Sequence, residues 1–223
     1  MGEATTTVSR AGRPERARLP RAFYSRPTLD VARDLIGKVL VHNRRGVVTS
    51  GIIVEVEAYI GELDPACHAA PGPTARNAPL YGRPGFAYVY LNYGIHPLFN
   101  VVTEQEGAPA AVLIRALEPL EGIDVMRRRR TRRMKGRRQR TLSQLSIHDL
   151  CRGPGNLTMA MGITLADNRA DLCGKRLYIR RQQVSSSPDI QWGPRIGIRV
   201  GTDRAWRAFV ASSRSVTGNK RPL

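Results

Sequence analysis

Short runs of β-branched and aromatic residues, separated by glycine, proline and asparagine, recur along most of this 223-residue chain. Runs of this length bounded by turn residues are typical of β-strands. We therefore expect strands at residues 38–42, 51–59, 87–91, 99–103, 111–117, 176–180, 195–200 and 206–211. Strands that follow one another with few helices between them predict an α+β fold with a mainly antiparallel sheet, rather than a nucleotide-binding βαβ fold.

Helical patterns are few. One is expected at residues 29–36, a second starts at Pro119 and continues into an arginine-rich stretch, and a third follows Gly153-Pro154-Gly155. The length suits a single folded domain. We expect that domain at residues 21–212, between a flexible basic leader at 1–20 and a flexible tail at 213–223.

No apolar run approaches the roughly 20 residues that a membrane-spanning helix needs, and the first residues lack the apolar stretch of a signal peptide. Three cysteines, at positions 67, 151 and 173, are too far apart for a Cys-x-x-Cys zinc pair and too few for a disulfide framework. These features predict a cytoplasmic protein, kept in a reducing compartment, with no membrane partner.

Positive charge is the strongest compositional signal. The chain has 36 Lys and Arg against 18 Asp and Glu, a formal net charge of +18. Such an excess predicts a polyanionic partner, with nucleic acid favoured over membrane. Residues 127–140 hold ten basic residues and no acidic one. This arginine block is expected either to contact phosphates or to remain a solvated, disordered loop.

Paired carboxylates stand out in the strand expected at residues 51–59. Glu55 and Glu57 alternate with small aliphatic residues, so both project from one face of the strand. Such a pair is either a solvent-facing edge or a catalytic face. Tyr59, Asp64 and His68 follow closely and add hydrogen-bonding groups. Together, the four acidic and histidine side chains would also suit a metal-dependent nuclease that uses Mg²⁺.

A tyrosine-rich hairpin is the second distinctive feature. Asn92-Tyr93-Gly94 would form a tight turn between two strands, because Asn and Gly tolerate positive φ angles. Tyr93 would then lie at the tip, exposed, where it could wedge into the base steps of a duplex. Tyr88 and Tyr90 share the face that leads away from the tip, and for Tyr88 we expect ordinary packing.

Five blocks of sequence carry a resemblance to a known family. In order along residues 23–210 they are VEAYIG, RPGFAYVYLNYGIHPLFNVV, AVLIRALEPLEGIDVMRRRR, CRGPGNLTMAMGI and PRIGI, and they resemble the alkyladenine (3-methyladenine) DNA glycosylase family. The resemblance implies one α+β domain with a curved, mainly antiparallel sheet, flanking helices and a protruding hairpin that inserts into DNA.

The same resemblance implies the activity. The enzyme would be a monofunctional glycosylase of base excision repair, without metal or cofactor and without lyase activity. It would act as a monomer on double-stranded DNA containing damaged purines: 3-methyladenine, 7-methylguanine, and also hypoxanthine and ethenoadenine. It would be associated with the nucleoid in a bacterium, or nuclear in a eukaryote.

Site residues are also implied by the resemblance, position by position. Glu57 matches the general base, Arg115 an arginine beside the attacking water, and Val210 a residue whose carbonyl helps hold that water. Tyr59 and His68 match residues that stack on one face of the flipped purine, and Tyr90 the partner on the other face. The remaining matches are the pocket residue Asn100, the intercalating Tyr93, and the DNA-backbone contacts Arg76, His96 and Gly155.

Asn156 departs from the family pattern, because a basic residue is common at this position. Two other functions stay open on the residues alone. A metal-dependent nuclease would lose its activity in EDTA. A non-enzymatic nucleic-acid module, such as a ribosome-associated protein, would bind undamaged RNA and tolerate Glu57→Gln.

Overall fold

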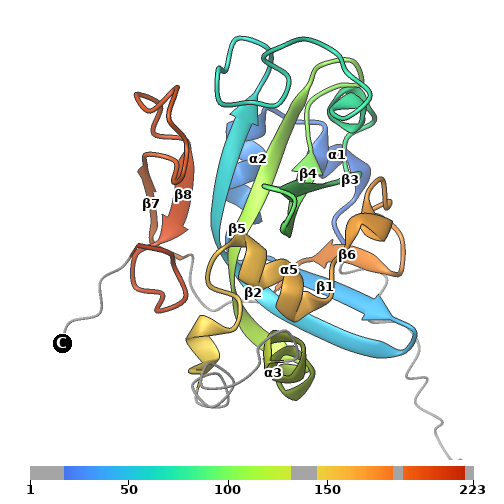
Figure 1. Cartoon of the computed structure of the whole chain (residues 1–223), viewed down its shortest axis with the longest axis vertical. Helices are drawn as coiled ribbons and strands as arrows, with labels where there is room; N and C mark the ends of the chain where they lie inside the picture. Colours follow the sequence, from blue (N-terminus) through green and yellow to red (C-terminus); the bar gives the residue numbers. More distant parts are fainter. Residues whose placement is uncertain (1–17, 132–144, 183–187, 219–223) are drawn as a thin grey trace, which may run out of the picture.

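A computed structural model describes residues 18–131, 145–182 and 188–218. Its eight strands form one antiparallel sheet that curls into a half-barrel (Figure 1). The strands are β1 (Val39–Arg44), β2 (Val47–Ile60), β3 (Ala87–Asn92), β4 (His96–Val102), β5 (Ala110–Glu121), β6 (Leu177–Arg180), β7 (Ile190–Gly193) and β8 (Arg207–Val210). The predicted α+β class with a mainly antiparallel sheet is therefore confirmed.

The long strand β2 organises the sheet. It pairs with β5 along one edge, and its other edge is shared by β1 at residues 47–52 and by β8 at residues 55–57. Beyond β5 the order continues through β4 to β3, and beyond β1 it ends at β6. The β7–β8 pair lies at one side of the sheet in Figure 1. The candidate catalytic residues Glu55 and Glu57 on β2 therefore lie between β5 on one edge and β8 on the other.

Helices cover the sheet at a few places. They are α1 (Arg21–Tyr24), α2 (Thr28–Leu35), α3 (Ile123–Thr131) and α5 (Pro154–Met161), with short 3₁₀ turns at Ala78–Tyr81, Ile147–Asp149 and Leu165–Asp167. Helix α2 buries Val31, Ala32 and Leu35, which recur at helical spacing and face β2 and β5. The buried apolar core runs between these helices and the sheet.

Most predicted strands are present with ends shifted by a few residues, but residues 195–200 form no strand. The prediction there was wrong, because Ile196 uses its backbone N–H to bind the Glu57 side chain instead of a neighbouring strand. The helix expected from Pro119 was also misplaced. Strand β5 continues to Glu121, and Gly122, with φ of 73°, makes the tight turn into α3.

The ends of the fold reach beyond residues 21–212. Leu19 is buried in the core, and Val216 is buried at the other end of the described chain. Residues 1–17 and 219–223 lie outside the described residues, as do 132–144. The part of the arginine block that is described belongs to α3, where Arg130 is largely buried. Within the described ranges, no helix is long and apolar enough to span a membrane.

Candidate active site

Two carboxylates and two arginines converge on one face of β2. Glu55 and Glu57 are both fully buried, so a solvent-facing strand edge is excluded. Arg207 on β8 lies directly opposite Glu57 in the ladder. On the other edge Glu57 pairs with Leu113, and alternation brings Arg115, two residues further along β5, to the same face. The ladder is irregular at Glu55, next to this arginine.

Three donors hold the Glu57 carboxylate. The Tyr59 hydroxyl donates over 2.8 Å, the Ile196 N–H over 2.6 Å, and Arg115 Nη1 lies 3.1 Å away. Burial nevertheless raises the pKa of Glu57 above its ordinary value, and the negative charge of Glu55 adds to this, against the opposing effect of the three donors. A buried carboxylate with a raised pKa is suited to accept a proton.

Glu55 has a different environment. Its oxygens accept from Arg115 Nε at 3.2 Å, from Arg207 Nη1 at 3.0 Å, and from both the backbone N–H (2.9 Å) and the hydroxyl of Thr217. Four donors on one carboxylate leave little capacity for a proton from water. Of the two glutamates, Glu57 is therefore the candidate base.

Asp64 does not join this pair. It accepts two hydrogen bonds from Arg195, at 2.5 and 2.8 Å. Burial opposes ionisation of Asp64, but the bonds and charge of Arg195 outweigh it and hold the pKa of Asp64 below its ordinary value. No group of three or more His, Cys, Asp or Glu side chains in the described part of the chain is placed to bind a metal ion. The nuclease alternative thus finds no support there.

An aromatic cavity lies beside Glu57. It is lined by Tyr59, Ala66, Cys67, His68, Leu80, Tyr88, Tyr90 and Asn100 and encloses about 30 Å³. This is about the volume of one water molecule, so a purine could enter only if the rings move apart. Asn100 is oriented by a hydrogen bond from its side-chain amide to the Tyr88 carbonyl, at 3.1 Å.

The rings that line this cavity are close to one another. The ring centroids of His68 and Tyr90 lie 4.3 Å apart, with an interplanar angle of 64°. Tyr59 lines the same cavity, and the expected stacking of Tyr59 and His68 on one face of a purine and Tyr90 on the other stays a prediction. His68 Nδ1 lies 2.9 Å from the Tyr88 hydroxyl. Burial, and secondarily the charge of Arg76, lowers the pKa of His68, which favours the neutral ring.

Tyr93 lies at the turn between β3 and β4, as the sequence predicted. Its φ is 48° and that of Gly94 is 69°. Tyr93 is 86% exposed, and the next apolar residue, Ile95, is 60% exposed. Sequence reasoning overlooked Ile95, although an apolar residue beside the tip was a visible signal. The two side chains present an exposed apolar edge on an otherwise polar turn.

Val210 does not reach Glu57. It lies three residues beyond the Glu57 partner Arg207, at the end of β8, and its carbonyl accepts from the Ser213 N–H at 3.0 Å. The expectation that this carbonyl helps hold the water is wrong in this geometry. The main-chain group beside Glu57 belongs to Ile196, in the PRIGI block.

The residues expected to contact the DNA backbone lie around the hairpin. Arg76 donates to the Leu91 carbonyl at 3.4 Å, and its guanidinium lies 6.0 Å from the Tyr90 ring centroid. His96 packs against the start of α5, since a Cβ on Gly155 would lie 3.1 Å from its side chain. Asn156 donates to the Arg152 carbonyl at 2.7 Å, so its side chain stabilises the helix start.

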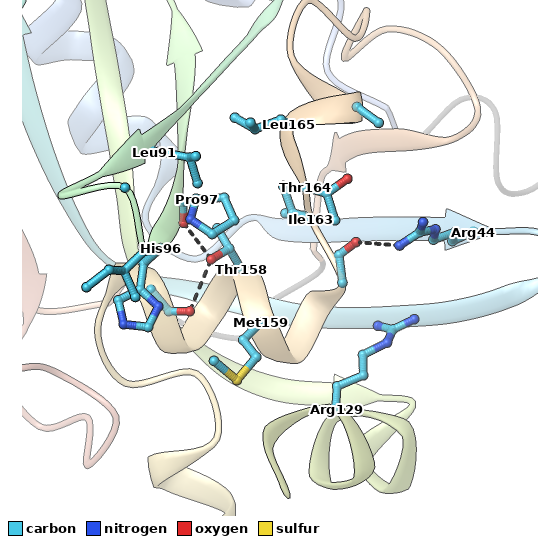
Figure 2. Close-up of a pocket in the computed structure, with 15 residues that line it drawn as sticks. Arg44, Leu91, His96, Pro97, Arg129, Thr158, Met159, Ile163, Thr164 and Leu165 are labelled. Atoms are coloured by element: carbon cyan, nitrogen blue, oxygen red, sulfur yellow. Dashed lines mark hydrogen bonds between the residues drawn. The ribbon is translucent and has the colours of Figure 1, made fainter. Parts of the chain in front are cut away.

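A groove of about 900 Å³ is lined by residues of this hairpin and of α5 (Figure 2). His96 and Pro97 line one side, and the Thr158 hydroxyl donates to the Pro97 carbonyl at 2.6 Å. At the far end, Arg129 donates to the Ala160 carbonyl at 3.0 Å and Arg44 to the Gly162 carbonyl at 3.4 Å. The groove therefore has a basic end, but it lacks the catalytic carboxylates.

Comparison with known proteins identifies the family of this chain. A family model described as methylpurine-DNA glycosylase matches residues 22–214. Several relatives carry the name "Putative 3-methyladenine DNA glycosylase". One from Chlorobium phaeobacteroides is 45% identical over 91% of this chain and 96% of its own length. Another, from Methanocella arvoryzae, is 47% identical over 89% and 95%, and one from Burkholderia lata is 46% identical over 90% and 91%.

Proposed function

Since this chain belongs to the methylpurine-DNA glycosylase family, and is therefore a DNA glycosylase that hydrolyses N-glycosyl bonds, we propose that it removes alkylated purines from duplex DNA with Glu57 as the general base. The observation that supports this most strongly is the Glu57 environment. The carboxylate is buried beside an aromatic cavity, has a raised pKa, and keeps three donors in place.

Access to the bond requires that the nucleotide leave the helix. The sugar carbon that water must attack is shielded in stacked DNA, and rotating the nucleotide outward costs a few kcal/mol. We assign the vacated space to Tyr93, whose exposed position at the hairpin tip suits a wedge between base steps. Ile95 would extend the same wedge.

The flipped purine would then stack with Tyr59 and His68 on one face and Tyr90 on the other, after the His68 and Tyr90 rings have moved apart. Each stacking contact contributes about 1–3 kcal/mol. A neutral His68 adds no repulsion toward a purine that alkylation has made cationic. Asn100 is held by Tyr88, and we assign it to disfavour unmodified guanine by crowding the exocyclic amine, whereas the positive charge of 7-methylguanine makes that base a better leaving group. The proposed substrates are 3-methyladenine and 7-methylguanine, followed by hypoxanthine and ethenoadenine.

Bond cleavage uses water as the nucleophile. As the N-glycosyl bond breaks, its electron pair leaves with the purine and positive charge develops on the sugar. The Glu57 carboxylate stabilises that charge and takes a proton from the water that bonds to the sugar carbon. A purine alkylated at N3 or N7 already carries positive charge and leaves as a neutral base. The product is an abasic site in an intact strand.

DNA contacts outside the pocket are assigned to Arg76, His96 and the backbone at Gly155. They lie around the hairpin and the start of α5, where a helix N-terminus favours a phosphate. One chain supplies every group in the proposed mechanism, so we expect the enzyme to act as a monomer.

The test is release of methylated purines from methylated duplex DNA in excess EDTA. Wild-type protein should release them and leave unbroken abasic strands. Glu57→Gln should slow release by about 10²–10⁴-fold, the usual contribution of a general base. Glu62→Gln changes an exposed carboxylate of the same segment and serves as the matched control. Equal rates for wild type and Glu57→Gln would refute the assignment, and loss of activity in EDTA would revive the nuclease alternative.

A further inference from the structure

Glu55 is a fully buried carboxylate that the proposed mechanism does not use. A carboxylate in such a place is costly unless donors surround it. Here the donors come from three separate parts of the chain: Arg115 on β5, Arg207 on β8, and Thr217 near the end of the described residues. Their arrangement links Glu55 to the candidate base.

Arg115 forms that link. Its Nε donates to Glu55 at 3.2 Å, while Nη1 of the same guanidinium lies 3.1 Å from Glu57 Oε2. Because a guanidinium is planar and rigid, the direction of its Nε–H toward Glu55 also fixes where Nη1 points. Glu55 therefore determines how Arg115 approaches Glu57.

Thr217 completes the arrangement. Its N–H and hydroxyl both donate to Glu55, and its hydroxyl oxygen lies 3.4 Å from Arg115 Nη2. Its carbonyl accepts from Arg207 at 3.3 Å. A threonine hydroxyl has one donor and can also accept, so this side chain can satisfy Glu55 and Arg115 together.

We propose that Glu55 and Thr217 act as a clamp that holds Arg115 in its orientation toward Glu57, so that both are positioning residues of the active site. This inference rests on the proposed role of Glu57. It assigns Glu55 and Thr217 no contact with the substrate. Their effect is transmitted through Arg115.

Loosening the clamp should affect chemistry more than DNA binding. Thr217→Val keeps the size and the backbone N–H but removes the hydroxyl. We expect base release in a single turnover to slow about tenfold, equivalent to 1.36 kcal/mol of activation free energy, with unchanged affinity for the lesion duplex. Thr217→Ser should restore the rate to within about twofold of wild type, because it restores the hydroxyl.

The matched control is Ser213→Ala. Ser213 donates to Glu118 and accepts from the Ser215 N–H, so its loss removes two nearby hydrogen bonds that involve none of Glu55, Thr217 and Arg115. It should lower thermal stability but leave the rate unchanged. If Ser213→Ala slows release as much as Thr217→Val, or if Thr217→Val is as fast as wild type, the clamp is refuted.

A second variant tests the clamp through pH. The charged and titratable groups around Glu57 in the described chain are Glu55 and Tyr59 on β2, Tyr90 on β3, Arg115 on β5, Arg207 on β8, and Arg195 behind Tyr59. Glu55→Gln removes the one neighbouring negative charge that raises the Glu57 pKa. The acid limb of the rate profile should therefore move to lower pH, with a lower plateau.

A purely structural Glu55 would lower stability and leave the plateau rate of base release unchanged, which would overturn the proposal. Wild type and Glu57→Gln are measured first on the same methylated duplex. If wild type releases no base, or Glu57→Gln is fully active, the proposed function fails. If those two behave as expected but the Thr217 and Glu55 variants do not, only the clamp fails.

Discussion

Glu57 and Asp64 are both fully buried carboxylates, seven residues apart, and each faces an arginine. Their environments nevertheless shift the pKa values of the two carboxyl groups in opposite directions. Arg195 gives two hydrogen bonds to Asp64 alone, and the N–H groups of Ala66 and Ile60 add two more. Arg115 is divided between Glu57 and Glu55. The pKa of Asp64 is lowered, whereas that of Glu57 is raised.

The difference shows how one segment can supply both a scaffold and a base. An arginine devoted to a single carboxylate stabilises the ionised form, and the pair becomes structural. Arg195 also lies over the rings of Tyr59, at 4.7 Å, and Trp206, at 5.2 Å, so the Asp64 pair supports the cavity wall from behind. Arg115 is shared between two carboxylates, so its positive charge offsets less of the cost of burying ionised Glu57. The Glu57 carboxylate can therefore take a proton.

The largest expected effect on stability comes from Asp64→Asn. It would leave Arg195 buried without its counter-charge, and breaking a buried pair in this way costs about 3–5 kcal/mol of unfolding free energy. Glu57→Gln should lower the unfolding free energy far less, because it removes a carboxylate whose ionised form burial already disfavours. Denaturant unfolding of both variants measures this. Equal losses would remove the distinction between the two sites.

The pH dependence should also separate the two carboxylates. A raised folded pKa means that ionised Glu57 lowers stability, and this cost disappears as pH falls toward the ordinary carboxyl value. Asp64, with its lowered pKa, contributes stability that is lost only below its ordinary value. The unfolding free energy of Glu57→Gln relative to that of wild type should therefore decrease as pH falls from 7 to about 4.5.

Base release should have the opposite trend, because the proposed mechanism needs ionised Glu57. The acid limb of the wild-type rate profile should lie above pH 4.5, the ordinary value for the side chain. Rates on methylated duplex between pH 4 and 8 measure it. A limb at or below 4.5 would mean that Glu57 is as easily ionised as a carboxylate in water, and its environment would not differ in effect from that of Asp64.

Tyr93→Ser should leave the ionisation of Glu57 and Asp64 unchanged, and it therefore serves as a test of the buried face alone. The hairpin tip lies outside the buried face, so only capture of the flipped base should weaken, by about 1–3 kcal/mol. Binding of lesion duplex and release from single-stranded substrate, measured together, separate the two steps. The acid limb should stay in place. A shifted acid limb would show that the hairpin tip influences the ionisation of Glu57, which would contradict the proposed separation of the two regions.

The smallest effect is expected from deletion of residues 132–140. The deletion starts after Thr131 because α3 is packed, with Arg130 donating to the Leu150 carbonyl at 2.7 Å. Each phosphate contact that is lost should reduce the slope of log affinity against log salt by about 0.9. Stability and release from bound DNA should not change. An unchanged slope would show that the block makes no DNA contact.

The local sequence pattern was sufficient to predict part of the fold and of the candidate site. Alternation along residues 51–59 placed Glu55 and Glu57 on one face, because side chains of a strand alternate whatever lies beyond it. Asn92 and Gly94 predicted the turn that exposes Tyr93, since positive φ is a local preference. The strands around them followed from β-branched runs bounded by turn residues, and the linked blocks identified the family.

Tertiary contacts decided the rest. Residues 195–200 read as a strand, yet the N–H of Ile196 is used by Glu57, 139 positions away in sequence. Thr217 reaches Glu55 across 162 positions. No local preference encodes such long-range contacts, because they depend on where β8 and the C-terminal segment pack against β2. The sequence left open which carboxylate has a raised pKa, and the donors that Glu57 and Asp64 contact after folding decided it; this difference supports the proposed role of Glu57 as the base.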